Sequence, residues 1–315
     1  MFSELSEAQT TDLKTEDLFA MKDTREILKK IRRLELRTRR LVDSMFAGSY
    51  HSVFKGRGMN FEEVREYNPG DEIRSIDWNV TARMNAPFVK KFTEERELTV
   101  MLVVDVSASG DFGSVESSKR ELAAEVASIL AFSAIKNNDK VGLLLFTDEV
   151  ELFIRPKKGR LHTLRLIREM LYFKPRHRGT NITAALEYLN KVVTRRAVVF
   201  LISDFLDEGY SRPLAVTARR HDLVAIPVVD PGEEDLPDVG IVTLEDPETG
   251  EQIDINTSSR ALRGAYLALE DKRKKSIDQE FNKLGIDMIP LRTNEDYLHV
   301  LRAFFDRREQ RQLSA

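Results

Sequence analysis

Three small oxygen-bearing side chains follow an apolar stretch of the sequence at alternate positions. Residues 100–110 read VMLVVDVSASG, in which Asp105, Ser107 and Ser109 mark the end of the apolar run. A nearly continuous apolar run of this kind is typical of a strand that is buried on both faces of a parallel sheet. One carboxylate and two hydroxyls that turn inward around one point offer the hard oxygen ligands that Mg²⁺ and Mn²⁺ prefer. The stretch therefore predicts a divalent-cation site at the end of a strand.

Two further oxygen-bearing side chains are expected at the same edge of the sheet. Asp204 ends a second apolar run, RRAVVFLISDF, and Thr180 stands in a loop just before a helical pattern. Ligands of open α/β sheets bind outside the carboxyl ends of the strands, near the point where the strand order reverses. With so few charged ligands, the ion would keep much of its charge and a position open to an outside ligand. The predicted ligands of Mg²⁺ or Mn²⁺ are Asp105, Ser107, Ser109 and Thr180, with Asp204 bound directly or through water.

A plainer interpretation treats the same residues as formers of turns and helix caps. Asp105 and the two serines that follow it could accept hydrogen bonds from nearby backbone N–H groups. Thr180 could be the N-cap of the next helix, and Asp204 could hold a loop. An Asp-x-Ser-x-Ser motif is weak evidence alone, but here it coincides with a buried strand end and the other two residues follow in the expected chain order.

Strand and helix patterns alternate from Leu98 onward. This alternation predicts an α/β fold with a doubly wound, mostly parallel sheet over residues 98–315. A turn around residues 247–250 predicts a hairpin in the second half. The expected strands include LTVMLVVDV, KVGLLLFTD, EVELFIRP, RRAVVFLISDF, HDLVAIPVVD and IDMIPLR. The expected helices cover residues 118–136, 161–173, the stretch after Thr180, 213–220, 259–284 and a last helix ending near 308.

Two smaller units are predicted ahead of this domain. Residues 1–47 form a helical segment with one apolar stripe, and its other faces are rich in Lys and Arg. Acidic residues interleave with these cations, so a solvated helix face is the plainer interpretation and nucleic-acid binding the alternative. Residues 48–97 show short runs separated by turn residues, which predicts a small β module.

The only tryptophan of the chain, Trp78, is expected to anchor the β module. Large aromatic side chains are usually well buried, and Arg74 and Arg83 would then pair with nearby carboxylates. An exposed Trp78 would instead indicate a binding hot spot.

Composition limits the classes of function. The 315 residues carry 49 Lys and Arg against 52 Asp and Glu, and the net charge of −3 gives no general attraction to nucleic acid or anionic membranes. The absence of cysteine excludes disulfides, thiolate metal sites and a cysteine nucleophile. No apolar run approaches the ~18 to 20 residues that span a bilayer, and the N-terminus has no signal-peptide pattern. We therefore expect a cytoplasmic protein without a membrane span.

The sequence motifs of common enzymes are not found. A phosphatase of the haloacid-dehalogenase type needs a second carboxylate where this chain has Ser107. There is no Gly-x-Ser-x-Gly elbow, no Walker loop and no pair of histidines at metal-ligand spacing. We expect a protein that is not an enzyme. A metal-dependent phosphohydrolase and a nucleic-acid binder that uses the basic N-terminal helix stay open as alternatives.

The residues from about Leu98 to Asp230 resemble a von Willebrand factor A (VWA) domain with its metal-ion-dependent adhesion site (MIDAS). DVSAS matches the Asp-x-Ser-x-Ser signature, RGTN resembles the loop with the threonine of the site, and FLISDF resembles the strand that ends in its second aspartate. The flanking YNPGDEIRSIDWNVTAR is similar to the hallmark of a bacterial family catalogued as domain of unknown function 58. The motif Ser203-Asp204-Phe205 departs from the Thr-Asp-Gly of many VWA domains, so Phe205 is expected to alter access to the ion.

This resemblance implies a non-enzymatic adaptor. Members of the family are commonly encoded beside MoxR-type AAA+ ATPases, and such pairs are thought to act in chaperone-like assembly or metal insertion. An acidic residue of the ATPase would complete the metal site. A cationic rim around the ion would steer that acidic surface, whereas the plainer interpretation is scattered solubilising charge. The candidate rim residues are Arg155, Lys157, Lys158, Arg160, Lys174, Arg176 and Arg178.

Overall fold

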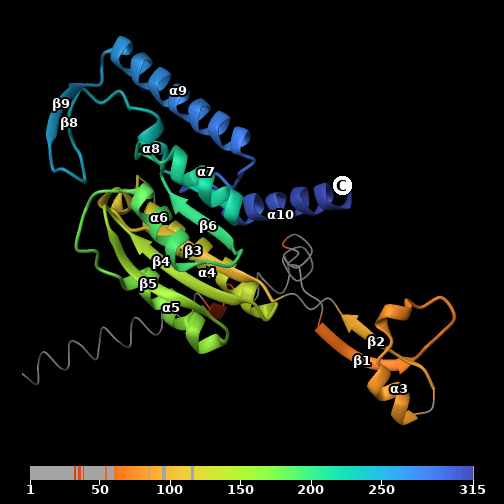
Figure 1. Cartoon of the computed structure of the whole chain (residues 1–315). Helices are drawn as coiled ribbons and strands as arrows, with labels where there is room; N and C mark the ends of the chain where they lie inside the picture. Colours follow the sequence, from red (N-terminus) through yellow and green to blue (C-terminus); the bar gives the residue numbers. More distant parts are fainter. Residues whose placement is uncertain are drawn as a thin grey trace, which may run out of the picture.

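The structure is a computed structural model of the chain (Figure 1). It describes residues 60–84, 86–93, 97–114 and 117–314, together with Arg32, Glu35, Leu36, Thr38 and Phe54.

A seven-stranded sheet forms the centre of the larger body (Figure 1). Its strands are β3 (Thr99–Asp105), β4 (Lys140–Phe146), β5 (Val150–Lys157), β6 (Val198–Ser203), β7 (Asp222–Val229), β10 (Asp287–Met288) and β11 (Leu291–Arg292). They lie in the order β10-β7-β6-β3-β4-β5, and β11 also pairs with β7. All neighbours run parallel except β4 and β5. The predicted doubly wound, mostly parallel α/β fold is confirmed.

The apolar runs become strands because both of their faces are covered. Along β3, Val100, Leu102 and Val104 point into one core, and Met101 and Val103 point into a second core on the other face. All five side chains are buried. Continuous apolar sequence is what a strand between two cores requires.

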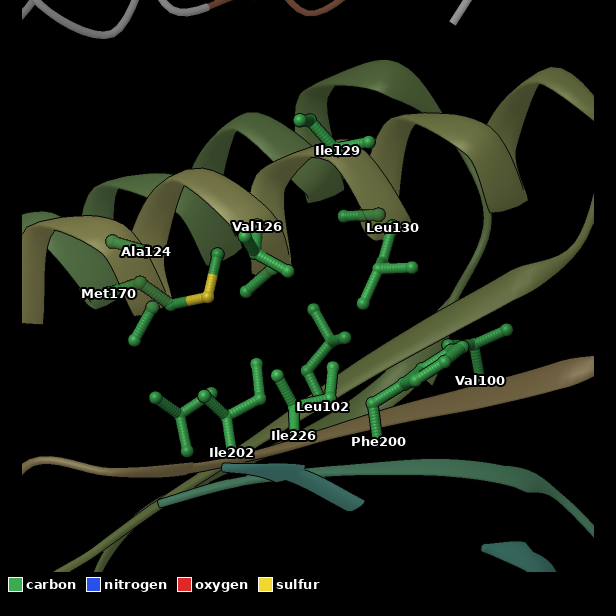
Figure 2. Close-up of a cluster of buried hydrophobic side chains, with 14 of the residues drawn as sticks. Val100, Leu102, Ala124, Val126, Ile129, Leu130, Met170, Phe200, Ile202 and Ile226 are labelled. Atoms are coloured by element: carbon green, nitrogen blue, oxygen red, sulfur yellow. The ribbon is translucent and has the colours of Figure 1, made fainter. Parts of the chain in front are cut away.

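Helices cover both faces of the sheet. The first core holds side chains of α4 (Lys119–Lys136), α5 (Arg160–Tyr172) and α10 (Tyr297–Leu313). Figure 2 shows Ile129 and Leu130 of α4 above Phe200 of the sheet. The second core holds side chains of α6 (Ile182–Val192), α7 (Ser211–Arg220) and the last turns of α9 (Arg260–Leu284). The short helices η2 (Ala108–Asp111) and α8 (Pro231–Glu234) follow β3 and β7 at their carboxyl ends.

A two-stranded hairpin lies between β7 and α9 in the chain. Its strands, β8 (Ile241–Glu245) and β9 (Gln252–Asn256), pair antiparallel, which confirms the predicted hairpin. The single strand expected for IDMIPLR is instead divided into β10 and β11, with Ile289 and Pro290 between them. A proline has no N–H group to donate to a strand ladder, which accounts for the interruption.

The segment around Trp78 differs from the prediction. β1 (Asn60–Glu66) and β2 (Phe88–Thr93) pair antiparallel, but η1 (Ile73–Ser75) and α3 (Trp78–Met84) lie between them. Asp77 begins α3, because its carboxylate accepts hydrogen bonds from the N–H groups of Asn79 (2.9 Å) and Val80 (3.3 Å). Trp78 is 67% exposed, so the expectation of a buried anchor is wrong. A two-stranded ribbon with one short helix offers too little thickness to enclose an indole ring.

Arg74 and Arg83 are also exposed, and neither forms an ion pair within the part of the chain that the structure describes. The expected pairing with carboxylates is therefore not seen. Arg65 makes the ion pair of this unit instead, with its Nη2 2.7 Å from Oδ1 of Asp71.

Isolated residues ahead of β1 contact the sheet domain. Phe54 is buried, with its ring edge-on to Phe200 at 5.8 Å and to Phe305 at 6.1 Å. Glu35 is buried and pairs with Arg160 at 2.6 Å. The rest of the predicted helix over 13–46 lies outside the described residues, and the domain boundaries at 47 and 97 stay predictions. Within the described ranges, no helix combines the length and the apolar character needed to cross a membrane.

Candidate functional site

The strand order reverses between β3 and β6. From β3 the chain adds β4 and β5 on one side of the sheet, and β6 and β7 then continue on the other side. Asp105 is the last residue of β3, and Asp204 directly follows β6. The two aspartates therefore lie at the carboxyl edge of neighbouring strands, where ligands of doubly wound sheets bind.

Asp105 is held by two hydrogen bonds. Its Oδ1 accepts one from the N–H of Ser107 (2.9 Å), and its Oδ2 accepts one from the hydroxyl of Ser203 (2.7 Å). Burial and then the nearby charge of Asp204 raise the pKa of Asp105 to about 7, although these hydrogen bonds oppose the rise. A cation at this position would favour the ionised carboxylate.

The two serines point their hydroxyls toward each other in a buried loop. The Oγ atoms of Ser107 and Ser109 are 3.0 Å apart, and both residues are buried. The guanidinium of Arg120 fixes the loop by donating to the carbonyls of Val106 and Ser107, each at 3.0 Å. The structure therefore brings the three residues of the Asp-x-Ser-x-Ser motif together, as the sequence predicts.

Thr180 belongs to a neighbouring loop that is tied to the serine loop. The N–H of Ala108 donates to the carbonyl of Arg178 at 2.9 Å and joins the two loops. Thr180 is not the N-cap of α6, contrary to the plainer interpretation, because Asn181 fills that position and accepts from the N–H of Ala184 (2.8 Å). The hydroxyl of Thr180 instead donates to Oε1 of Glu248 at 2.6 Å.

Sequence reasoning missed Glu248, which reaches the site from the turn between β8 and β9. Burial raises the pKa of Glu248, the hydrogen bond from Thr180 opposes this, and the charges of Asp204 and Asp246 add to the rise. Glu248 is 68 positions from Thr180 in the chain, so no local spacing links the two residues.

Asp204 is paired with a lysine that sequence reasoning also missed. Nζ of Lys119 lies 2.8 Å from Oδ2 of Asp204 and 2.6 Å from Oε1 of Glu233. The side chains of Lys119 and Asp204 are only 3% and 6% exposed. Burial lowers the pKa of Lys119, but the two carboxylates outweigh it and hold the pKa above its usual value. The remaining oxygen of Asp204 accepts from the N–H of Leu206 at 3.3 Å.

These residues fit a hard divalent cation. Asp105, Ser109, Lys119, Ser203 and Asp204 are among the residues that line a cavity of about 20 Å³, enough for one water-sized occupant. The available donors are carboxylate and hydroxyl oxygens, as Mg²⁺ and Mn²⁺ require. Among the described residues no group of three or more His, Cys, Asp or Glu forms a metal cage, so the hydroxyls would have to supply part of the coordination.

Phe205 does not cover this site. It is 2% exposed and packs in the second core, with its ring 5.2 Å from Phe281 and 6.0 Å from Tyr210. Its backbone has φ +56°, a left-handed conformation that favours glycine. The expected effect of its bulk on access to the ion is therefore wrong, since the ring is committed to the core.

The seven candidate rim cations divide into two groups. In the antiparallel pair of β4 and β5, Val150 lies opposite Phe146 and Lys157 lies opposite Val141. Lys157 is therefore at the end of the sheet opposite Asp105, which pairs with Phe146. The prediction of one continuous rim is wrong. The group at or toward the far end consists of Arg155, Lys157, Lys158 and Arg160, and the group in the loop before Thr180 consists of Lys174, Arg176 and Arg178.

The far group already has partners. Lys158 pairs with Glu97 at 3.1 Å, and Arg160 pairs with Glu35. In the near group, the carbonyl of Arg178 carries the hydrogen bond to the serine loop. Only the near group lies in a loop that adjoins the candidate site.

Comparisons with known proteins agree with this architecture. The crystal structure of the conserved hypothetical protein BatB from Bacteroides thetaiotaomicron is similar with a TM-score of 0.44 and 17% identity, over 68% of this chain and 99% of that one. The crystal structure of the SpRpn10 VWA domain is similar with a TM-score of 0.37 and 12% identity, over 65% of this chain and 94% of that one.

Relatives in sequence are all uncharacterized. One from Mycobacterium tuberculosis is 32% identical over 279 residues, which is 88% of each chain. A second, YeaD from Bacillus subtilis, is 32% identical over 90 residues, which is 29% of this chain and 21% of that protein. The family model described as "Protein of unknown function DUF58" matches residues 63–276. This chain therefore belongs to the DUF58 family.

Proposed function

We propose that this DUF58 protein is a cytoplasmic, non-enzymatic adaptor that binds a partner protein through a divalent metal ion. The observation that supports this most directly is the convergence of Asp105, Ser107 and Ser109 at the switch point of a VWA-like sheet, with the Thr180 loop tied to them. In this proposal the metal is Mg²⁺ or Mn²⁺, and the site is of the MIDAS type.

Each side chain has a part in this proposal. Asp105 supplies the negative charge, while Ser107, Ser109 and Thr180 supply neutral oxygens. Asp204 takes part through a water, because Lys119 already occupies its Oδ2. A bound ion with so few charged ligands supplies Lewis acidity toward an external carboxylate. The protein contributes the fixed positions of the oxygens, which are set by two strand ends and two joined loops.

The proposed partner is a MoxR-type AAA+ ATPase, whose acidic side chain would complete the metal site. This part of the proposal rests on the family, since relatives are commonly encoded beside such ATPases. The pair would act in chaperone-like assembly or metal insertion. The near group of cations, Lys174, Arg176 and Arg178, would raise the rate at which the acidic surface associates.

The test is a pulldown with the full chain from cells that contain the ATPase, with and without a chelator. We expect the ATPase to be retained by the wild type and lost with the chelator or with Asp105→Ala. Calorimetry should show Mg²⁺ binding in the wild type and none in Asp105→Ala. Retention of the ATPase under all three conditions would contradict a metal-dependent interface. Turnover of a phosphoester with Mg²⁺, or salt-sensitive retention on DNA or RNA, would favour the alternative functions instead.

A further inference from the structure

The β8–β9 hairpin is a ribbon that is attached to the protein at its base and at its tip. At the base, Thr257 is fully buried, its N–H donates to the carbonyl of Gly240 at 2.7 Å, and its hydroxyl accepts from the N–H of Val239 at 3.2 Å. Most residues of the two strands are exposed. Figure 1 shows the hairpin as an arm beside α8 and α9.

The turn of the hairpin holds Glu248 in a fixed position. Oδ1 of Asp246 accepts from the N–H groups of Glu248 (2.8 Å) and Thr249 (3.2 Å), and the carbonyl of Asp246 accepts from Gly250 (2.8 Å). Gly250 has φ +73°, which a residue with a side chain adopts only with strain. The turn is therefore ordered by its own hydrogen bonds, and Glu248 is not at the end of a loose loop.

The carboxylate of Glu248 is lodged against the loop of the candidate metal site. Its Oε1 accepts from the hydroxyl of Thr180 at 2.6 Å, and its Oε2 lies 3.6 Å from the position that a Cβ on Gly179 would take. Its charge lies close enough to Asp204 for the two carboxylates to repel each other. A third carboxylate beside Asp105 and Asp204 is unfavourable unless a cation lies among them.

We propose that Glu248 is the chain's own ligand for the outward position of the metal site, and that an acidic side chain of the partner must displace it. This inference rests on the proposed function and adds a regulatory step to it. With the hairpin in place, the position that an outside carboxylate needs is already filled. With the hairpin lifted, the same ion is free to bind the partner.

The test uses Mn²⁺ and the full chain, with Glu248→Gln against the control Glu251→Gln. Both variants remove one charge from the same turn, but the described contacts of Glu251 involve only its backbone and not its side chain. We expect Glu248→Gln to raise the Kd for Mn²⁺ about tenfold, because it removes a charged ligand. Water-proton relaxation per bound Mn²⁺ should also rise, since a water takes the vacated position. Added acetate should reverse that rise in Glu248→Gln and leave the wild type and Glu251→Gln unchanged.

The outcomes separate this inference from the proposed function. If Asp105→Ala abolishes Mn²⁺ binding but Glu248→Gln matches the wild type in affinity and relaxation, the metal site stands and the role of Glu248 is overturned. If Asp105→Ala binds Mn²⁺ like the wild type, the proposed function is overturned, and the inference that rests on it is overturned as well. Equal thermal unfolding of Glu248→Gln and Glu251→Gln shows that neither result comes from misfolding.

Discussion

Lys119 gives the candidate site an unequal distribution of charge. Its ammonium neutralises Asp204 and Glu233 from inside the protein, at 2.8 Å and 2.6 Å. Asp105 has no such cation in the described part of the chain, and its two hydrogen bonds come from a backbone N–H and a hydroxyl. A buried carboxylate without a counter-charge is costly, so an added cation stabilises Asp105 more than Asp204. This is why Asp105 is the residue whose substitution should abolish metal binding.

Asp139 makes the stability of the protein depend on pH. Its side chain is buried, its Oδ1 accepts from the N–H of Leu98 at 2.8 Å, and its Oδ2 has no hydrogen-bond partner among the described residues. Burial raises the pKa of Asp139 to about 7, although the bond from Leu98 and the charge of Lys158 oppose the rise.

The folded state therefore binds a proton that the unfolded state has already released between about pH 4 and pH 7. The contribution of Asp139 to stability is complete below about pH 4 and is lost as the pH rises through 7. Asp139→Asn removes this titration, and any cost of its unpaired amide does not vary with pH. Urea unfolding at pH 5 and pH 8 should show that the wild type loses about 1 to 4 kcal/mol relative to the variant over this range. Parallel losses in both proteins would contradict the assignment.

At this scale, the sequence predicts residues that act through local order and misses those that act over long distances. Asp105, Ser107 and Ser109 could be found because one strand end and one turn place all three. Lys119 and Glu248 could not, since each reaches the site by a contact between elements that are far apart in the chain. Nothing in the spacing of a lysine at the first position of a helix shows which carboxylate it will meet.

At the scale of elements, Phe54 anchors a segment ahead of β1 to the sheet domain. Its ring lies among Phe200, Phe305 and the guanidinium of Arg308, whose Cζ is 4.5 Å from the ring centroid. Phe54→Ala should lower the free energy of unfolding by about 3 to 5 kcal/mol, because it leaves a cavity and removes these contacts. Phe112→Ala is the matched control, since Phe112 is 42% exposed. Equal urea midpoints for the two variants would show that Phe54 does not pack as described.

Trp78 should make little contribution to stability and more to recognition. Because its side chain is 67% exposed, Trp78→Ala should change the free energy of unfolding by no more than about 0.5 kcal/mol. As the only tryptophan, it also reports its own environment by fluorescence. We expect emission typical of a hydrated indole that iodide quenches readily, and quenching that decreases when the ATPase binds. Emission that iodide cannot reach in the free protein would contradict the exposed position.

Elements whose patterns were long and periodic could be predicted, and short ones could not. Strands such as β3 and β6 are buried on both faces, so their apolar runs are unambiguous. In residues 73–84, apolar and polar residues alternate as in a strand, but the cap at Asp77 begins a helix there. A local hydrogen bond to the backbone outweighs a weak alternation over so few residues.

At the scale of the whole molecule, the two groups of cations lie at different ends of the sheet, and this allows a matched test of steering. Lys174→Glu with Arg176→Glu reverses charge in the loop before Thr180, whereas Arg155→Glu with Lys157→Glu reverses the same charge on β5. We expect the first pair to slow association with the ATPase by about tenfold or more and to weaken its salt dependence. The second pair should leave the association rate close to that of the wild type. Stopped-flow measurements at two salt concentrations check this, and equal slowing by both pairs would show that only net charge matters.

The reversed direction of β5 has a consequence for the behaviour of the protein at high concentration. β5 is the last strand of the sheet, so one side of its backbone has no strand of this sheet to pair with. An open edge of this kind invites a strand of another molecule and promotes aggregation. Pro156 removes a donor there, and Arg155 and Lys157 place charge on both sides of it. Cations that do not serve the metal site thus keep the sheets of neighbouring molecules apart.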